Sequence, residues 1–156
     1  MGRGAQVDLE LCASVARTCT AHNLRKATRA VSGLFDEAMR PTGLRISQLG
    51  VLVALALAEE ATVSRLAALL DLDRTTMTRN LAPLERQGLV ASGAGDDARN
   101  RHLRLTEKGS EKLARALTVW GRVQQRVVAG LGEARWKGLL RDLEAAASIA
   151  RPVTRT

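Results

Sequence analysis

Residues 70–90, LDLDRTTMTRNLAPLERQGLV, combine helical spacing with side chains that a buried helix seldom uses. Threonine loses rotamer freedom in a helix and covers little apolar surface, so a core would favour leucine here. Short hydroxyls and methyls suit phosphate oxygens and thymine methyls, and an arginine fork can hold a guanine by two hydrogen bonds. The pattern predicts a helix whose first half reads DNA and whose second half packs on a core through Leu81, Leu84 and Leu89. The predicted DNA-contacting residues of this helix are Arg74, Thr75, Thr76, Thr78, Arg79 and Asn80.

The flanking residues predict that this helix is the second of a helix-turn-helix. Asp73 can cap it, Gly88 can end it after about residue 87, and Pro83 inside it should bend it. Upstream, Thr62 can cap a helix of about two turns over VSRLAALL. Only a tight turn, which includes Asp71, separates the two helices, and this arrangement is typical of a helix-turn-helix.

A β-hairpin is predicted next. Residues 89–91 and 102–105 form its strands, around a loop rich in Gly and Asp. The tip of the loop carries Arg99 and Arg101. An arginine at such a tip can enter a minor groove, whose negative potential deepens where the groove narrows. We therefore expect both arginines to contact DNA.

Amphipathic helices are predicted on both sides of these elements. Residues 14–40 carry apolar side chains at three- and four-residue spacing, and Pro41 closes the run. Ser47 can cap a helix over residues 48–58 that is apolar nearly all round, so this helix should be the buried centre. Thr106 is predicted to cap a further helix, and a last helix follows it. The apolar stripes of these two helices are larger than a small winged domain can cover, so a partner is implied, and a symmetric homodimer is the simplest one. The stripes are Leu113, Leu117, Trp120, Val123, Val127 and Leu131, then Trp136, Leu139, Leu140, Leu143 and Ala147.

The composition limits the classes of function. The 156 residues suit one domain, and a hydrophobic content of 46% that is mostly Ala, Leu and Val favours helices. A net charge of +8 suits a polyanionic partner without identifying it. The longest apolar run, residues 50–58, is far short of the ~20 that span a bilayer, and no signal peptide is visible, so a cytoplasmic location is expected. Two histidines, with no Gly-rich phosphate loop or metal-ligand cluster, argue against an enzyme and against a metal or cofactor.

The order of the predicted elements is that of a winged helix-turn-helix between two sets of helices. The segments DRTTMTRNLAPLERQGLV and GDDARNRHLRLTEKG resemble the recognition helix and wing of the MarR family of bacterial transcriptional regulators. The resemblance covers about residues 24–143 and is most specific at the D-x-R of Asp97 and Arg99 and at LTEKG, residues 105–109. One departure is Asp71, where this family usually has Gly in the turn, although aspartate tolerates a left-handed conformation better than most residues.

The resemblance implies a mainly α fold with a small β-hairpin wing, in one MarR-like domain over residues 1–156. Residues 14–40 and 106–150 would be dimerisation helices, and 47–105 the winged helix-turn-helix DNA-binding region. Asp97 would brace the wing arginines. The implied function is that of a dimeric, sequence-specific regulator on a palindromic operator in double-stranded DNA, because its two recognition helices would reach major grooves about 34 Å apart.

Similar regulators usually repress and release DNA when a small aromatic acid or an oxidant biases the dimer. The sequence assigns no residue to an effector site and does not identify the signal. It also leaves open two other classes, a sequence-indifferent architectural DNA-binding protein and a protein-interaction module on a winged-helix fold. The operator and the choice between repression and activation are likewise undetermined.

Cys12 and Cys19 are the candidate redox residues. If both were helical they would lie on one face about 10 Å apart, which is too far for a disulfide within one chain. A bridge between subunits, a sulfenic acid at one of them, and an inert buried thiol are the alternatives. The peroxide-sensing branch of the family has tyrosines beside its thiol, and this chain has none. His22 follows Cys19 by three residues, but two ligands do not complete a zinc site.

Overall fold

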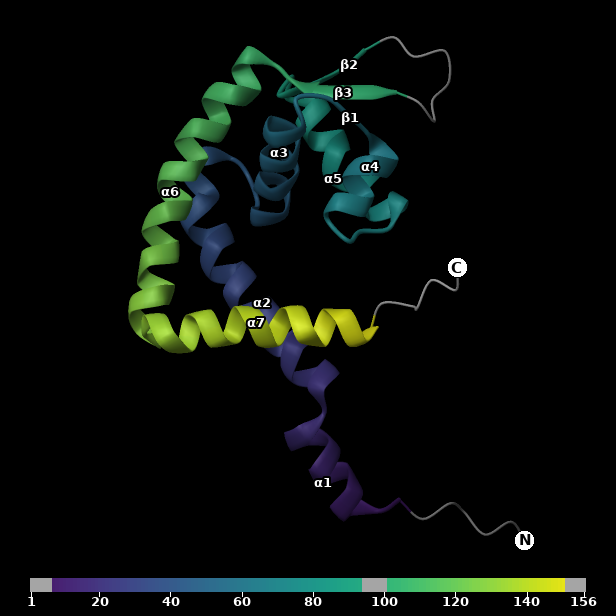
Figure 1. Ribbon diagram of the computed structural model, residues 1–156, viewed down its shortest axis with the longest axis vertical. Helices are drawn as coiled ribbons and strands as arrows, with labels where there is room; N and C mark the ends of the chain where they lie inside the picture. Colours follow the sequence, from purple (N-terminus) through teal and green to yellow (C-terminus); the bar gives the residue numbers. More distant parts are fainter. Residues whose placement is uncertain (1–6, 94–100, 151–156) are drawn as a thin grey trace, which may run out of the picture.

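A computed structural model describes residues 7–93 and 101–150 of the chain. Its winged part contains α3, α4 and α5 with a small sheet, and the long α6 runs from this part to α7 (Figure 1). The expected fold class, mainly α with a small β wing, is confirmed. The helices and strands are α1 (Leu9–Thr18), α2 (Thr20–Met39), η1 (Arg40–Thr42), α3 (Ile46–Ala58), β1 (Ala61–Thr62), α4 (Val63–Leu69), α5 (Arg74–Arg86), β2 (Val90–Ser92), β3 (His102–Leu105), α6 (Glu107–Leu131) and α7 (Glu133–Ala150).

Helix α3 is the centre of the core, as its apolar composition predicts. Val51, Leu52 and Leu55 are fully buried, and α5, α6 and β3 pack around the helix. The predicted start of this helix was wrong, because Ser47 lies inside it rather than capping it. The Gln48 side chain instead accepts a hydrogen bond from the amide of Arg45, the residue just before the helix, and Asp36 on α2 accepts one from the amide of Ile46 at 2.7 Å.

The single N-terminal helix predicted over residues 14–40 is two helices. Asp8 caps α1 by accepting hydrogen bonds from the amides of residues 10 and 11, so the helical segment begins earlier than expected. Cys19 then adopts an extended conformation, with φ −63° and ψ 112°, and breaks the run. The Asn23 side chain donates to the carbonyls of Arg17 and Cys19 and so joins the two sides of the break. The Cys19 carbonyl also accepts the first backbone hydrogen bond of α2, from the Asn23 amide. Apolar periodicity continues across such a one-residue break, which is why the pattern missed it.

The sheet has three antiparallel strands in the order β1-β3-β2, one more than the predicted hairpin. Ala61 and Thr62 form the unpredicted strand β1, paired with Leu103 and His102. Strand β2 begins at Val90, one residue later than expected, and β3 has the predicted bounds. Because β1 has only two residues, it exists through its pairing with β3 rather than through a pattern of its own.

No single helix among the described residues is long and apolar enough to cross a bilayer. The α2–η1 segment and α3 would reach that length and composition only together, and they meet at a bend of 73°. The apolar residues of α3 are those of the core described above.

Gly109 fixes the junction between α6 and the wing. Thr106 caps α6 as predicted, accepting a hydrogen bond from the Gly109 amide at 2.9 Å and donating one to the carbonyl of Gly88 at 2.7 Å. Gly109 is buried, and a Cβ added to it would overlap the backbone carbonyl of Leu89, just before β2. The glycine of the LTEKG motif therefore lets the first turn of α6 approach the backbone that leads into the wing.

We predict that Gly109→Ala destabilises the protein by about 1–3 kcal/mol, because overpacking against backbone costs more than the ~1 kcal/mol that alanine gains in a helix. The measurement is urea unfolding followed by circular dichroism. Gly121→Ala, in the same helix with open space around it, is the matched control and should be neutral or stabilising. Equal midpoints for the two variants would contradict this account of the motif.

Candidate nucleic-acid interface

The two helices of the helix-turn-helix, α4 and α5, meet at the predicted tight turn. Thr62 caps α4 by accepting a hydrogen bond from the amide of Arg65 at 3.2 Å. Asp71 has φ +50°, so the aspartate does adopt the left-handed conformation that a glycine would adopt more easily. The amide of Leu72 then donates to the carbonyl of Ala67 at 2.8 Å. The turn therefore keeps this backbone hydrogen bond with aspartate in place of the glycine that is usual in the family.

Asp73 caps α5 with both carboxylate oxygens. One oxygen accepts from the Thr76 amide at 2.9 Å and the other from the Thr76 hydroxyl at 2.6 Å. The hydrogen bond from the Thr76 hydroxyl, and to a smaller extent the one from the Thr76 amide, hold the pKa of Asp73 below its ordinary value of 3.8. The carboxylate is therefore charged at neutral pH, and it fixes where the helix begins.

The first half of α5 has one buried side and one exposed side. Met77, Leu81 and Leu84 are buried at helical spacing against the core, which confirms the predicted packing of the second half. The helix therefore turns most of its polar residues toward solvent. Of the predicted DNA-contacting residues on α5, Arg74, Thr75, Thr78 and Arg79 are exposed, whereas Thr76 and Asn80 are partly buried.

Three polar residues on this helix also have partners within the fold. The Thr76 hydroxyl donates to Asp73, and the Thr78 hydroxyl donates to the carbonyl of Arg74 at 2.8 Å. The Asn80 side-chain oxygen accepts from the Ser47 hydroxyl at 3.2 Å, which ties α5 to α3. Arg74, Thr75 and Arg79 are therefore the exposed residues of the set whose side chains make no such hydrogen bond within the described residues.

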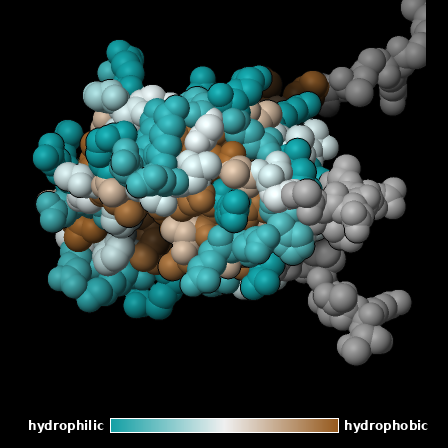
Figure 2. Space-filling model, turned by 90° about the horizontal axis from the view of Figure 1, so that it is seen from above, coloured by the Kyte–Doolittle hydropathy of each residue, from teal (hydrophilic) through white to brown (hydrophobic). Residues whose placement is uncertain are grey.

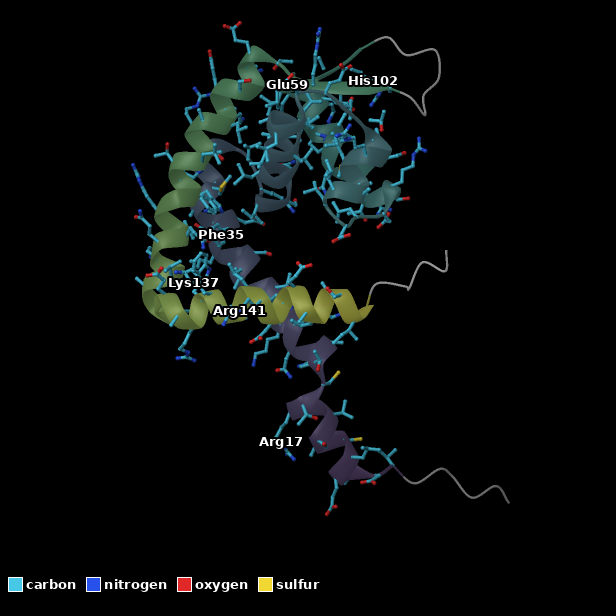
Figure 3. The ribbon with its side chains drawn as sticks, viewed as in Figure 1. Arg17, Phe35, Glu59, His102, Lys137 and Arg141 are labelled. Carbon is cyan, nitrogen blue, oxygen red and sulfur yellow. The ribbon has the colours of Figure 1, made fainter. Side chains whose placement is uncertain are left out.

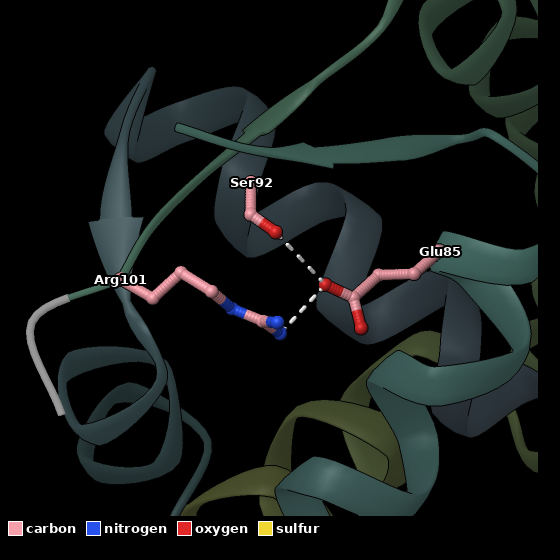
Figure 4. A network of polar contacts seen from close by, with 3 residues as sticks. All are labelled: Glu85, Ser92 and Arg101. Atoms are coloured by element: carbon pink, nitrogen blue, oxygen red, sulfur yellow. Dashed lines mark hydrogen bonds and ion pairs between the residues drawn. The ribbon is translucent and has the colours of Figure 1, made fainter. Parts of the chain in front are cut away.

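Arg101, one residue before β3, is held by α5. Its guanidinium donates to Glu85 on α5 at 2.7 Å, and the same carboxylate oxygen accepts from the Ser92 hydroxyl at 3.4 Å (Figure 4). The side chains are 41% and 25% exposed for Arg101 and Glu85, so the pair contributes ~1 kcal/mol or less. Its effect is geometric, because one carboxylate joins the ends of both wing strands to α5.

A hollow of about 180 Å³ lies beside this ion pair, between α5 and the base of the wing. Arg74, Thr78, Leu81 and Glu85 line it from α5 at spacings of four, three and four residues, and Arg101 lines it from the wing. Glu85 was not among the predicted site residues, although it shares the helical stripe of Arg74 and Thr78. Two guanidiniums against one carboxylate leave the hollow suited to a phosphate oxygen.

The wing tip lies outside the described residues. The predicted minor-groove arginine, Arg99, and its predicted brace, Asp97, both fall in the segment 94–100. Arg101 is the one predicted wing residue within the described chain.

The two cysteines do not share one helical face. Cys12 is on α1 and exposed, and Cys19 is at the break between α1 and α2 and partly buried. The expectation of a buried thiol is therefore wrong for Cys12 in the protomer. Within the described residues, no three His, Cys, Asp or Glu side chains come together as metal ligands, so Cys19 and His22 gain no third partner there.

The N-cap of α5 predicts a pH-dependent stability. A carboxyl group whose pKa is lower in the folded protein than in the unfolded chain stabilises the fold when the pH is above its pKa in the unfolded chain. This stabilisation is lost as the pH falls through its pKa in the folded protein. Asp73→Ala should therefore lower the urea midpoint near neutral pH, and the difference from the parent protein should shrink below about pH 4. Asp142→Ala, an exposed position on α7, is the control and should leave the midpoint nearly unchanged. A deficit for Asp73→Ala that stayed constant down to acid pH would contradict the cap.

Comparisons with known proteins agree with this geometry. A model of the MarR family matches residues 42–99. In sequence, the uncharacterized HTH-type transcriptional regulator YwoH of Bacillus subtilis is 29% identical over 91 residues, which cover 58% of this chain and 66% of that protein. In structure, the M. tuberculosis transcriptional regulator MosR has a TM-score of 0.76 at 35% identity, covering 86% of this chain and 96% of its own. MosR in complex with DNA has a TM-score of 0.73 at 38% identity, covering 85% and 98%. The transcriptional repressor CouR, bound to a 23-mer DNA duplex, has a TM-score of 0.74 at 27% identity, and the match covers 94% of this chain and 100% of CouR.

These likenesses extend beyond the helix-turn-helix. The match to MosR includes the flanking helices, because it covers 86% of this chain. The proteins named above are transcriptional regulators rather than enzymes, and two of the three structures named contain DNA. Together with the exposed polar half of α5 and the wing beside it, they show that the chain belongs to the MarR family and is a DNA-binding transcriptional regulator.

Proposed function

We propose that the protein is a dimeric repressor that binds a palindromic operator and is released by a small-molecule or oxidant signal. The observation that carries this proposal is the division of α5 into a buried apolar side and an exposed side with Thr75 and Arg79. Such a helix can enter a major groove without disturbing the core. Repression is supported by the likeness to CouR, described as a transcriptional repressor, at 27% identity over its whole length.

The predicted contact residues divide into two roles. Thr75 and Arg79 are proposed to contact base edges, because they are exposed near the start of α5. Arg74 and Arg101, which line the hollow beside the wing, are proposed to hold phosphates. From the sequence alone, Arg99 is proposed to enter the minor groove with Asp97 as its brace. Thr76, Thr78 and Asn80 stay predicted contacts with a second, structural use.

A homodimer is proposed because the helices outside the winged part expose apolar side chains. They are Val31 and Leu34 on α2, Leu117 and Trp120 on α6, and Leu139, Leu140 and Leu143 on α7. Large exposed apolar patches mark interaction sites, and a two-fold axis through these helices would bury the same residues of both copies. The axis would also set the separation of the two recognition helices, so a signal that shifts these helices changes DNA affinity.

The operator prediction is tested by selecting random duplexes with the reduced protein. We expect an enriched palindrome whose half-sites lie about one helical turn apart, since each half-site receives one α5. The winner is then titrated by fluorescence anisotropy before and after a mild hydroperoxide, with a Cys12→Ser, Cys19→Ser double variant as control. Release of the parent protein but not of the double variant identifies an oxidant signal.

The other outcomes of this selection are equally informative. A palindrome that is held equally well after oxidation keeps the regulator and directs the search to small aromatic acids. Failure to enrich any sequence contradicts sequence-specific reading and favours an architectural DNA-binding protein. Sedimentation or light scattering on the same sample measures whether the protein is a dimer.

The role of Arg79 is tested by a matched pair of substitutions on one helix. Arg79→Ala should cost ~1–3 kcal/mol, concentrated on one base position of the operator. Arg86→Ala removes an exposed arginine at the other end of α5 and should weaken all duplexes slightly and equally. A loss for Arg79→Ala that is equal on every duplex would mean that this arginine contacts only phosphates.

A further inference from the structure

Two large apolar side chains are exposed on the winged part itself. Leu57 at the end of α3 is 83% exposed and Leu69 at the end of α4 is 56% exposed. The other large exposed hydrophobic residues of the described chain lie just before α1 or on α1, α2, α6 and α7. Packing of α2, α6 and α7 against a second copy therefore leaves these two leucines unexplained. A view from the winged end shows hydrophobic residues reaching the surface between hydrophilic ones (Figure 2).

Leu57 and Leu69 line the same depression, which we call the α3–α4 hollow. It has a volume of about 420 Å³ and is lined from α3 by Val53 and Leu57 and from α4 by Arg65 and Leu69. Apart from Arg65, its lining side chains are aliphatic. Two helices with an apolar hollow between them form the kind of groove that accepts the apolar side of a third helix.

Helix α1 has an apolar side and little to pack against. None of its ten residues is buried, and it extends away from the winged part, beyond α7 (Figure 1). Arg17 on α1 stands well apart from the other labelled side chains (Figure 3). Leu11 and Val15, and Cys12 and Ala16, are four residues apart and line one open apolar depression. A ten-residue helix is about 15 Å long and is too short to be stable in water without packing.

We propose that α1 of one copy docks in the α3–α4 hollow of a second copy. This inference rests on the proposed homodimer and adds a second contact to it. Because α1 leads away from its own winged part, a two-fold axis through α2, α6 and α7 carries it toward the winged part of the partner. The charges of the two surfaces are complementary. Asp8, at the start of α1, lies on the same side as Leu11 and Val15, and Arg65 lines the hollow that would receive this side.

The docked arrangement places a thiol beside the DNA-reading part of the other copy. Cys12 lies on the side of α1 that enters the hollow, and the hollow is lined by α4, which packs directly on α5. A polar group attached to Cys12 would therefore weaken the contact with the partner's helix-turn-helix.

Cysteine cross-linking tests the contact. Two differently tagged chains are co-expressed in a Cys12→Ser, Cys19→Ser background, one with Val15→Cys and the other with Leu69→Cys. A short bis-maleimide should then give a covalent heterodimer on a denaturing gel. Neither single-cysteine chain expressed alone should give a covalent dimer. In the proposed arrangement α1 lies against the hollow of the partner, so two α1 helices do not meet and two hollows do not meet.

A matched control separates this contact from the other surfaces of the dimer. The pair Val15→Cys and Leu143→Cys places the second thiol on α7 and should not cross-link. Cross-linking of that pair, or of Val15→Cys with itself, would overturn the proposal and place α1 on another surface of the dimer. Light scattering on the same samples measures the oligomeric state, so a monomer would overturn the homodimer, whereas an uncross-linked dimer would overturn the docking of α1 alone.

Discussion

The packing of α5 on α3 is the interaction on which the rest of the molecule depends. Met77, Leu81 and Leu84 of α5 are each at most 1% exposed, and α3 lies against them at the centre of the core. Full burial of each such side chain is worth about 1.5–3 kcal/mol. A rotation of α5 that exposed them would therefore cost more than any single polar contact on its outer side. Because this packing fixes the rotation of the helix, it also decides that Thr75 and Arg79 are presented to solvent.

A set of weaker contacts joins the recognition helix to the wing and to α6. The Glu85 carboxylate reaches both wing strands, and the Thr106 hydroxyl and Lys108 ammonium donate to the carbonyls of Gly88 and Gln87 where α5 ends. The close approach of Gly109 to Leu89 completes this junction. Polar contacts at partly exposed positions add little stability, so their consequence is geometric: the wing, the recognition helix and α6 share one set of backbone positions.

This junction explains how a distant event can reach the DNA-reading side. Helix α6 has 25 residues, which is about 37 Å of helix, and it runs from the wing junction to α7. The middle of α6, with Leu117 and Trp120, and α7 expose apolar side chains that we assign to the dimer contact. A change in how two copies pack there would be carried by α6 as a nearly rigid element, because its first turn is fixed against the wing. In the proposed dimer, the spacing of the two recognition helices would thus be coupled to the interface through α6 itself.

The sequence by itself determined the features that depend on neighbouring residues. Thr62, Asp73 and Thr106 cap the helices that were expected of them, since a capping side chain bonds an amide only two or three residues away. The exposed and buried sides of α5 follow from helical spacing alone, and the resemblance of the recognition helix and wing to the MarR family pointed to the function.

Only the tertiary structure decided the features that join distant segments. Strand β1 exists because β3 offers it an edge, and α3 begins at Ile46 partly because Asp36, ten residues earlier, accepts its amide hydrogen bond. The partnership of Glu85 with Arg101 spans sixteen residues, and the hollow between α3 and α4 appears only when both helices are in place. No local pattern encodes such contacts, because their geometry is set by the packing of the core and not by spacing along the chain.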